Sequence, residues 1–166
     1  MSSPSVSSPQ PTVSPKPIDP RGPRFGAAIT SVVLAVVLIL GPGMGALILL
    51  IIQTIAFGLG SVVGLAAQPY GLVYFRLVRP RLSPPSELED PRPPRFAQTV
   101  GLIFALAGLI GLVALLPVLF YIAVGFALVA ALLNSVFSYC LGCELYLLGR
   151  RALGRPLARI VPANQS

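Results

Sequence analysis

The stretch Asp19-Pro20-Arg21-Gly22-Pro23-Arg24-Phe25 decides how the chain is divided. It returns as Asp90-Pro91-Arg92-Pro93-Pro94-Arg95-Phe96 at a fixed offset (90 − 19 = 71), which also aligns Gly71 with Gly142 without a gap. Aspartate, arginine and proline are residues that membrane segments disfavour or use sparingly, so a chance match between two apolar segments would not include them. The sequence therefore predicts an internal repeat of one unit.

Each copy of this motif is followed by a long segment without charge, from Phe25 to Phe75 and from Phe96 to Cys143. Each segment has about 50 residues, far more than the ~20 that span a hydrocarbon core, so we expect each to cross the membrane twice. The turn Gly41-Pro42-Gly43 divides the first segment, and Pro117 starts a new helix in the second. The predicted fold is an all-α integral membrane protein with four transmembrane helices, arranged as two parallel-repeat helical hairpins.

The predicted spans and the predicted domains follow from this division. The spans are 26–40, 44–68, 97–115 and 117–139. The domains are a disordered Ser/Pro-rich tail at 1–18, a first repeat at 19–80, a cytoplasmic linker at 81–89, a second repeat at 90–151 and a basic C-terminal tail at 152–166.

We expect each hairpin to be followed by a short interfacial helix. Proline at position 69 should end the second span, and Gly142 permits a break at the matching place in the second repeat. The segments 72–79 and 143–151 then carry the Tyr, Leu and terminal Arg residues that are typical of helices lying at a membrane surface.

The arginines predict the orientation. All twelve Lys and Arg residues lie in the N-terminal segment, the middle loop or the C-terminal tail, and the hairpin tips near Pro42 and Pro117 have none. The positive-inside rule therefore places both termini and the loop 76–95 in the cytoplasm, with the protein in the cytoplasmic membrane. Because the chain is so apolar, we interpret its net charge of +7 as a topology signal and expect no nucleic-acid partner.

Composition excludes several kinds of chemistry. The chain has no His, which rules out a Ser-His-Asp triad and His metal ligands. Its two cysteines cannot complete a four-coordinate zinc site alone. We therefore predict no metal and no cofactor.

Two amide side chains, Gln53 and Asn134, fall deep inside the predicted spans. Each would be costly facing lipid, so we expect both to be buried in the bundle interior. They could serve as structural hydrogen-bonding groups, or as a polar site for a lipid headgroup or a quinone carbonyl. The repeated motif has two interpretations as well, a helix start at the membrane surface or a ligand site built from Asp19, Arg21, Arg24, Phe25, Asp90, Arg92, Arg95 and Phe96.

The candidate catalytic residues are Cys140, Cys143 and Glu144. Cys140 and Cys143 are the only two cysteines of the chain, and Glu144 follows Cys143 directly. All three lie at the predicted cytoplasmic surface. Residues three apart can form a disulfide, with about 5 Å between their Cα atoms. If the helix continues through the pair, its C-terminal dipole disfavours a thiolate; if the chain bends there, a new helix N-terminus favours one. Glu144 could relay a proton.

The pair is open to three interpretations, which are redox or sulfur chemistry, apolar packing, and metal or cluster binding at a dimer seam. The cytoplasm is reducing, which argues against a permanent structural disulfide and favours a transient one.

The paired D-P-R-x-P-R-F motifs and the C-L-G-C motif resemble an uncharacterised, mainly actinobacterial family of four-span membrane proteins, catalogued only as a domain of unknown function. The resemblance covers about Ile18 to Arg151. It implies a sulfur or thiol-redox setting, because members are often encoded near thioredoxin-like or rhodanese-type sulfurtransferase proteins. The family has no established catalytic residue to carry over.

The functional hypothesis is a thiol–disulfide or sulfur-handling membrane component that acts through Cys140 and Cys143. Its expected partners are the lipid bilayer and a cytosolic thioredoxin-like or sulfurtransferase protein. The alternative is a non-catalytic membrane scaffold or transporter subunit with structural cysteines. Either could be a homo-oligomer, and whether the protein is an enzyme stays open.

Overall fold

Four long apolar helices make up most of the computed structural model, which describes residues 16–154 and 161–162. They are α1 (Arg21–Leu40), α2 (Met44–Val62), α4 (Arg92–Val113) and α5 (Pro117–Phe137), and each is long and apolar enough to cross a membrane. This confirms the predicted fold class of an all-α, multi-pass membrane protein.

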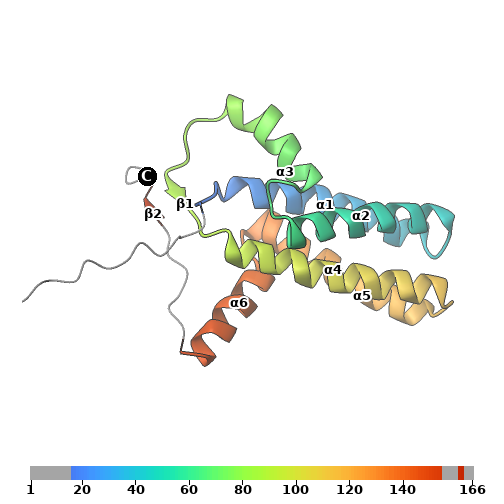
Figure 1. Cartoon of the computed structure of the whole chain (residues 1–166). Helices are drawn as coiled ribbons and strands as arrows, with labels where there is room; N and C mark the ends of the chain where they lie inside the picture. Colours follow the sequence, from blue (N-terminus) through green and yellow to red (C-terminus); the bar gives the residue numbers. More distant parts are fainter. Residues whose placement is uncertain (1–15, 155–160, 163–166) are drawn as a thin grey trace, which may run out of the picture.

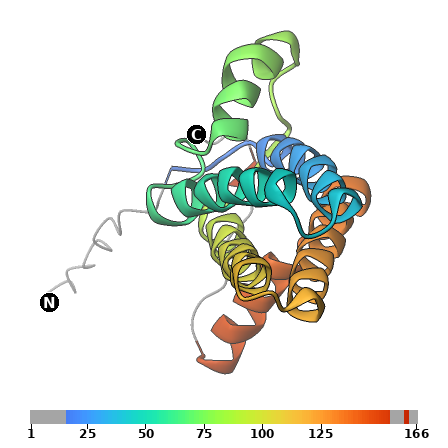
Figure 2. The same ribbon diagram turned by 90° about the vertical axis from the view of Figure 1, so that its right-hand side faces the viewer.

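The four spans form a bundle whose members follow one another around a common axis (Figures 1 and 2). α1 packs against α2 and α5, and α4 packs against α2 and α5. Both hairpin tips lie at one end of the bundle, and the starts of α1 and α4 lie at the other (Figure 1). The bundle core is built from Leu34, Val37, Ala46, Leu50, Phe57, Ala105, Phe120, Val124 and Ala127.

The outer face of the bundle is apolar. Large hydrophobic side chains point outward from every span, and Ile39 and Leu115 near the two tips are 83% and 85% exposed. An apolar surface of this extent is costly in water and suits lipid chains, so the spans contact the bilayer.

The repeated motif starts both hairpins. The Asp19 carboxylate accepts a hydrogen bond from the Arg21 amide at 3.0 Å, and Asp90 accepts one from the Arg92 amide at 2.9 Å. The prolines of each motif fit the first turn, where a missing amide proton costs nothing. α1 therefore begins at Arg21 and α4 at Arg92, each five residues before the predicted spans.

A short helical segment follows each hairpin and extends away from the bundle, on opposite sides of it (Figure 1). The first consists of α3 (Pro69–Val73), a π-helical turn η1 (Tyr74–Val78) and a 3-10 turn η2 (Arg79–Arg81). The second is α6 (Leu141–Ala152).

The first of these bends differs from the sequence prediction. α2 ends at Val62 rather than at position 68, because Gly64 adopts a left-handed backbone (φ 127°) that stops the helix. Proline at position 69 begins α3 instead of ending the span.

The second bend also differs. Ser138, with φ 56°, ends α5, and the chain is extended at Cys140 before α6 begins. The break therefore precedes Gly142, which lies inside the first turn of α6. A Cβ at Gly142 would lie 2.6 Å from the Cα of Ala97, so glycine is needed there for the close approach of α6 to α4.

The linker forms short antiparallel backbone pairings with two other parts of the chain, and we call these pairings the ladder. Strand β1 (Glu87–Leu88) pairs antiparallel with β2 (Val161–Pro162). Next to it, the backbones of Ile18 and Glu89 exchange two hydrogen bonds of 2.9 Å. The ladder holds the linker beside the start of α1 (Figure 1).

Candidate functional site

A cavity of about 320 Å³ opens at the end of the bundle where the helices start. Its walls come from the first turns of α1 and α4, the last turns of α5, the first turns of α6, and the linker. Two prolines of each motif line it, namely Pro20, Pro23, Pro93 and Pro94. The cavity thus brings together residues from both copies of the motif and from the cysteine segment.

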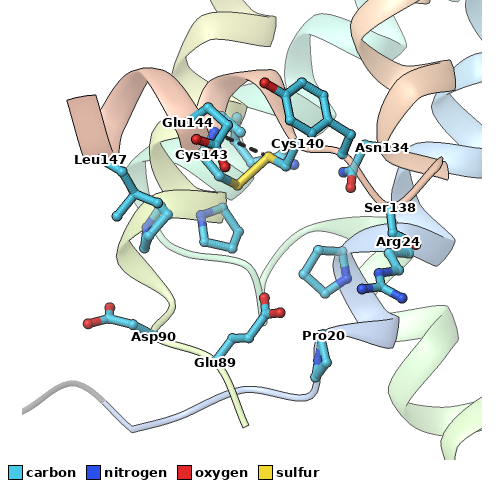
Figure 3. Close-up of a pocket in the computed structure, with 16 residues that line it drawn as sticks. Pro20, Arg24, Glu89, Asp90, Asn134, Ser138, Cys140, Cys143, Glu144 and Leu147 are labelled. Carbon is cyan, nitrogen blue, oxygen red and sulfur yellow. Dashed lines mark hydrogen bonds between the residues drawn. A yellow bond between two sulfur atoms is a disulfide. The ribbon is translucent and has the colours of Figure 1, made fainter. Parts of the chain in front are cut away.

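Cys140 and Cys143 line this cavity and are joined by a disulfide, with their Cα atoms 5.2 Å apart. Both are half-buried, and the sulfur–sulfur bond lies across the cavity from Glu89 and Pro20 (Figure 3). Cys140 is the N-cap of α6, and its sulfur accepts a hydrogen bond from the Cys143 amide at 3.2 Å. Of the two geometries left open by the sequence, the pair therefore has the helix N-terminal one.

Glu144 lies beside Cys143 in the first turn of α6 and lines the same cavity (Figure 3). Its side chain is exposed. An acid at this position interacts favourably with the positive end of the helix dipole. The three candidate residues are therefore brought together at one helix end.

Two of the charged motif residues, Arg24 and Asp90, line the cavity. Arg95 instead donates hydrogen bonds to the Ser61 carbonyl at 2.7 Å and to the Val62 carbonyl. Arg95 thus satisfies two of the free carbonyl groups at the end of α2.

Asp90 is paired within its own motif. Its carboxylate accepts hydrogen bonds from the Arg92 side chain at 2.9 and 3.0 Å. Burial alone would raise the pKa of Asp90, but the hydrogen bonds and charge of Arg92 outweigh burial and hold the pKa below its ordinary value. Asp90 therefore stays ionised and neutralised by Arg92.

In the first motif, the aspartate is buried. Asp19 is 4% exposed and accepts a hydrogen bond of 3.0 Å from the Tyr74 hydroxyl, and Arg21 lies 3.6 Å away. Burial, together with the hydrogen bond to Asp19, raises the pKa of Tyr74 to about 12. The Phe25 and Tyr74 rings lie 5.8 Å apart, and Phe96 and Tyr146 lie 5.7 Å apart. These motif residues therefore anchor the short helical segments.

The two amides of the spans have different environments. Gln53 is fully buried and hydrogen bonds to Thr30 at 3.3 Å and to the Tyr70 hydroxyl at 2.9 Å. Its polar atoms are thus satisfied within the bundle, which supports the structural interpretation. Asn134 is half-buried and lines the cavity (Figure 3).

The cavity residues that sequence reasoning missed include Glu89, Gln98 and Ser138. The position of Glu89 directly before the second motif is a local signal that could have pointed to it. Gln98 and Ser138 reach the cavity only through the packing of α4 against α5. Across residues 16–154 and 161–162, no cluster of three His, Cys, Asp or Glu side chains is placed to hold a metal ion.

The chain belongs to the family described as domain of unknown function (DUF4395), whose model matches residues 18–151. This confirms the resemblance to a family catalogued only in those terms. No curated protein and no solved structure matches the chain.

Proposed function

We propose that this DUF4395 protein is a membrane-embedded thiol–disulfide exchange component in which Cys140 and Cys143 form the reacting pair. One observation carries the proposal: a half-buried disulfide at the N-terminus of α6 lines an open cavity at the end of the bundle where α1 and α4 begin. A packing role does not require the sulfurs to face a cavity.

We assign a role to each residue of the pair from its position at the helix end. The sulfur of Cys140 receives the Cys143 amide hydrogen bond and lies at the positive end of α6, which stabilises a thiolate there. In the reduced protein Cys140 attacks a partner disulfide, forming a mixed disulfide and releasing a partner thiolate. Cys143 then attacks Cys140, which restores the protein disulfide and releases the second partner thiol. Glu144 is positioned to take up the proton of Cys143.

The setting of this chemistry is the cytoplasmic face of the membrane. The described arginines lie at the end of the bundle where α1 and α4 begin, and the hairpin tips at the other end carry none. The positive-inside rule expects this distribution when the arginine-bearing end is cytoplasmic. The partner that the family resemblance implies is a thioredoxin-like or sulfurtransferase protein of the cytosol.

The two hairpins are proposed to be copies of one unit. α1 and α4 begin at positions 71 residues apart, at the same residue of the motif. In each short segment an arginine lies over an aromatic ring one turn earlier, Arg79 over Phe75 at 5.4 Å and Arg150 over Tyr146 at 5.8 Å. These pairs are also separated by the same offset, which supports an internal repeat.

The exchange function is tested by redox titration of the full-length protein in detergent micelles. After equilibration in dithiothreitol buffers of defined poise, free thiols are alkylated with a maleimide that adds mass. We expect one reversible two-electron transition. Cys143→Ser should react with iodoacetamide about fivefold faster than Cys140→Ser, since only the former keeps the thiol at the helix end.

Two results would contradict the proposal. One is a pair that stays fully reduced or fully oxidised at every poise, and the other is equal alkylation of the two single variants. A Cys140→Ser, Cys143→Ser double variant that retains the cellular role of the protein would favour the scaffold or transporter subunit instead.

A further inference from the structure

The cavity beside the disulfide carries charges of both signs. Arg24 lies on one side, Glu89 rises from the wall opposite the disulfide, and Glu144 lies beside Cys143 (Figure 3). Within the described part of the chain, none of these charged groups takes part in an ion pair, whereas Asp90 is paired with Arg92. A ligand with both a carboxylate and an ammonium group would find a counter-charge for each.

The volume of the cavity limits the size of that ligand. At about 320 Å³ it lies at the lower end of the ~300–1,000 Å³ that small-molecule sites occupy. A molecule the size of an amino acid or a short peptide fits this volume. The four prolines provide rigid apolar walls, and the amide of Asn134 provides a neutral polar group.

We infer that the cavity binds a low-molecular-weight thiol that carries both an ammonium and a carboxylate group, and that this thiol is a substrate of the Cys140–Cys143 disulfide. The inference rests on the proposed exchange function and adds a substrate class to it. The carboxylate lies at Arg24 and the ammonium lies toward Glu89 and Glu144, so that the sulfur faces the disulfide.

The reaction balances with the thiol as the reductant. The thiolate of one molecule attacks a sulfur of the disulfide, forming a mixed disulfide and releasing the other cysteine as a thiolate, which takes up a proton. A second molecule attacks the small-molecule sulfur of the mixed disulfide. The products are one small-molecule disulfide and two cysteine thiols, so two electrons and two protons pass to the protein.

Four thiols that differ only in charged groups test the inference: cysteine, cysteamine, 3-mercaptopropionate and 2-mercaptoethanol. The rate at which each reduces the oxidised full-length protein in micelles is measured at equal thiolate concentration. Each rate is divided by the rate with a small model disulfide. We expect cysteine to exceed 2-mercaptoethanol about tenfold, since two exposed charge contacts contribute about threefold each.

Variants at the cavity separate the two contacts. Arg24→Gln should lower the ratio of the 3-mercaptopropionate rate to the 2-mercaptoethanol rate about threefold, and Glu89→Gln should lower the corresponding cysteamine ratio by a similar factor. Arg95→Gln is the matched control, since Arg95 occupies the same motif position as Arg24 but bonds to the end of α2. Its ratios should equal those of the wild type.

Equal normalised rates for all four thiols, or ratios that neither cavity variant changes, would overturn the substrate class and leave the exchange function standing. A disulfide that dithiothreitol fails to reduce in the folded protein would instead remove the exchange function, and the substrate class with it.

Discussion

The two halves of the molecule begin alike and end differently. In the first half, Tyr74 packs against Gly22 and bonds to the buried Asp19, and only a hollow of about 50 Å³ remains beside the motif. In the second half, the residue at the position of Tyr74 is Leu145, which is 54% exposed, and a cavity of about 320 Å³ contains the disulfide. The segment after the first hairpin is thus anchored by a buried tyrosine, whereas the matching residue of the second half is an exposed leucine.

The motif arginines differ in the same sense. Arg95 crosses to the end of α2 and bonds to its carbonyl groups, but α5 ends in a left-handed Ser138, and Arg24 faces the cavity instead. The first half is therefore closed by its own packing. The second half contains a cavity, and Arg24 of the first half forms part of its wall.

The largest expected effect comes from the contact that holds α6 to α4. Gly142→Ala places a methyl group against the Ala97 backbone and should lower the free energy of unfolding by about 2–3 kcal/mol. Gly149→Ala, in the same helix with open space around it, should instead raise it by about 0.5–1 kcal/mol. Thermal unfolding in micelles measures both, and equal effects would show that α6 is not held by this contact.

The next effect concerns closure of the first half. Tyr74→Phe leaves the buried Asp19 without a hydrogen-bond donor and should cost about 1–3 kcal/mol of unfolding free energy. Tyr146→Phe, which removes only a partly buried bond from Arg150, should change it by less than about 0.5 kcal/mol. If the two tyrosines proved equivalent, the proposed difference between the halves would be wrong.

The same tyrosine predicts a pH dependence. The pKa of Tyr74 is raised to about 12 from the ordinary 10.0, so the folded state favours the neutral phenol. Its stabilising contribution is present below pH 10 and is lost as the pH rises toward 12. Unfolding measured from pH 8 to 12 should show this loss in the wild type and a smaller loss in Tyr74→Phe; identical profiles would exclude Tyr74 as the source.

Arg95→Gln tests the difference between the arginines. It removes both hydrogen bonds to the end of α2 and should cost about 1 kcal/mol of unfolding free energy. Arg24→Gln, at an exposed position lining the cavity, should cost less than about 0.5 kcal/mol. A larger loss in Arg24→Gln, measured by the same unfolding assay, would mean that Arg24 is structural.

The smallest effect belongs to the ion pair of the second motif, in which Arg92 is exposed and the Asp90 side chain is largely buried. Asp90→Asn should cost less than about 1 kcal/mol at pH 7. Burial opposes ionisation of Asp90, but Arg92 lowers its pKa, so the contribution exists above the ordinary pKa of 3.8 and disappears as the pH falls through the lower folded value. Unfolding curves of variant and wild type should therefore converge in acid; a constant difference would assign the effect to packing.

The sequence predicts the spans well, since charge-free length and turn residues are local signals. Gly41, Pro42 and Pro117 mark both tips correctly. The bends are harder to predict, because Gly64 and Ser138 end their helices through positive-φ backbone conformations, whereas Pro69 and Gly142 are the stronger signals in the sequence.

The candidate site could be predicted only in part. The cysteine pair and its acid are adjacent in sequence and were found. The cavity depends on Arg24, Glu89 and Asn134, which lie on three different elements, and only the packing of α1 and α4 on α5 brings them together. No periodicity or spacing in one chain encodes such a convergence.

The small ladder has a consequence for biogenesis. Glu89, which forms part of the cavity wall, is held by backbone pairing to Ile18, and the neighbouring β1 is paired to β2. Because β2 follows all six α-helices that the structure describes, a ribosome must translate them before β1 and β2 can pair. The pairing of Ile18 with Glu89 can form as soon as Glu89 has been translated, whereas the pairing of β1 with β2 must wait until both hairpins have emerged and can have inserted into the bilayer.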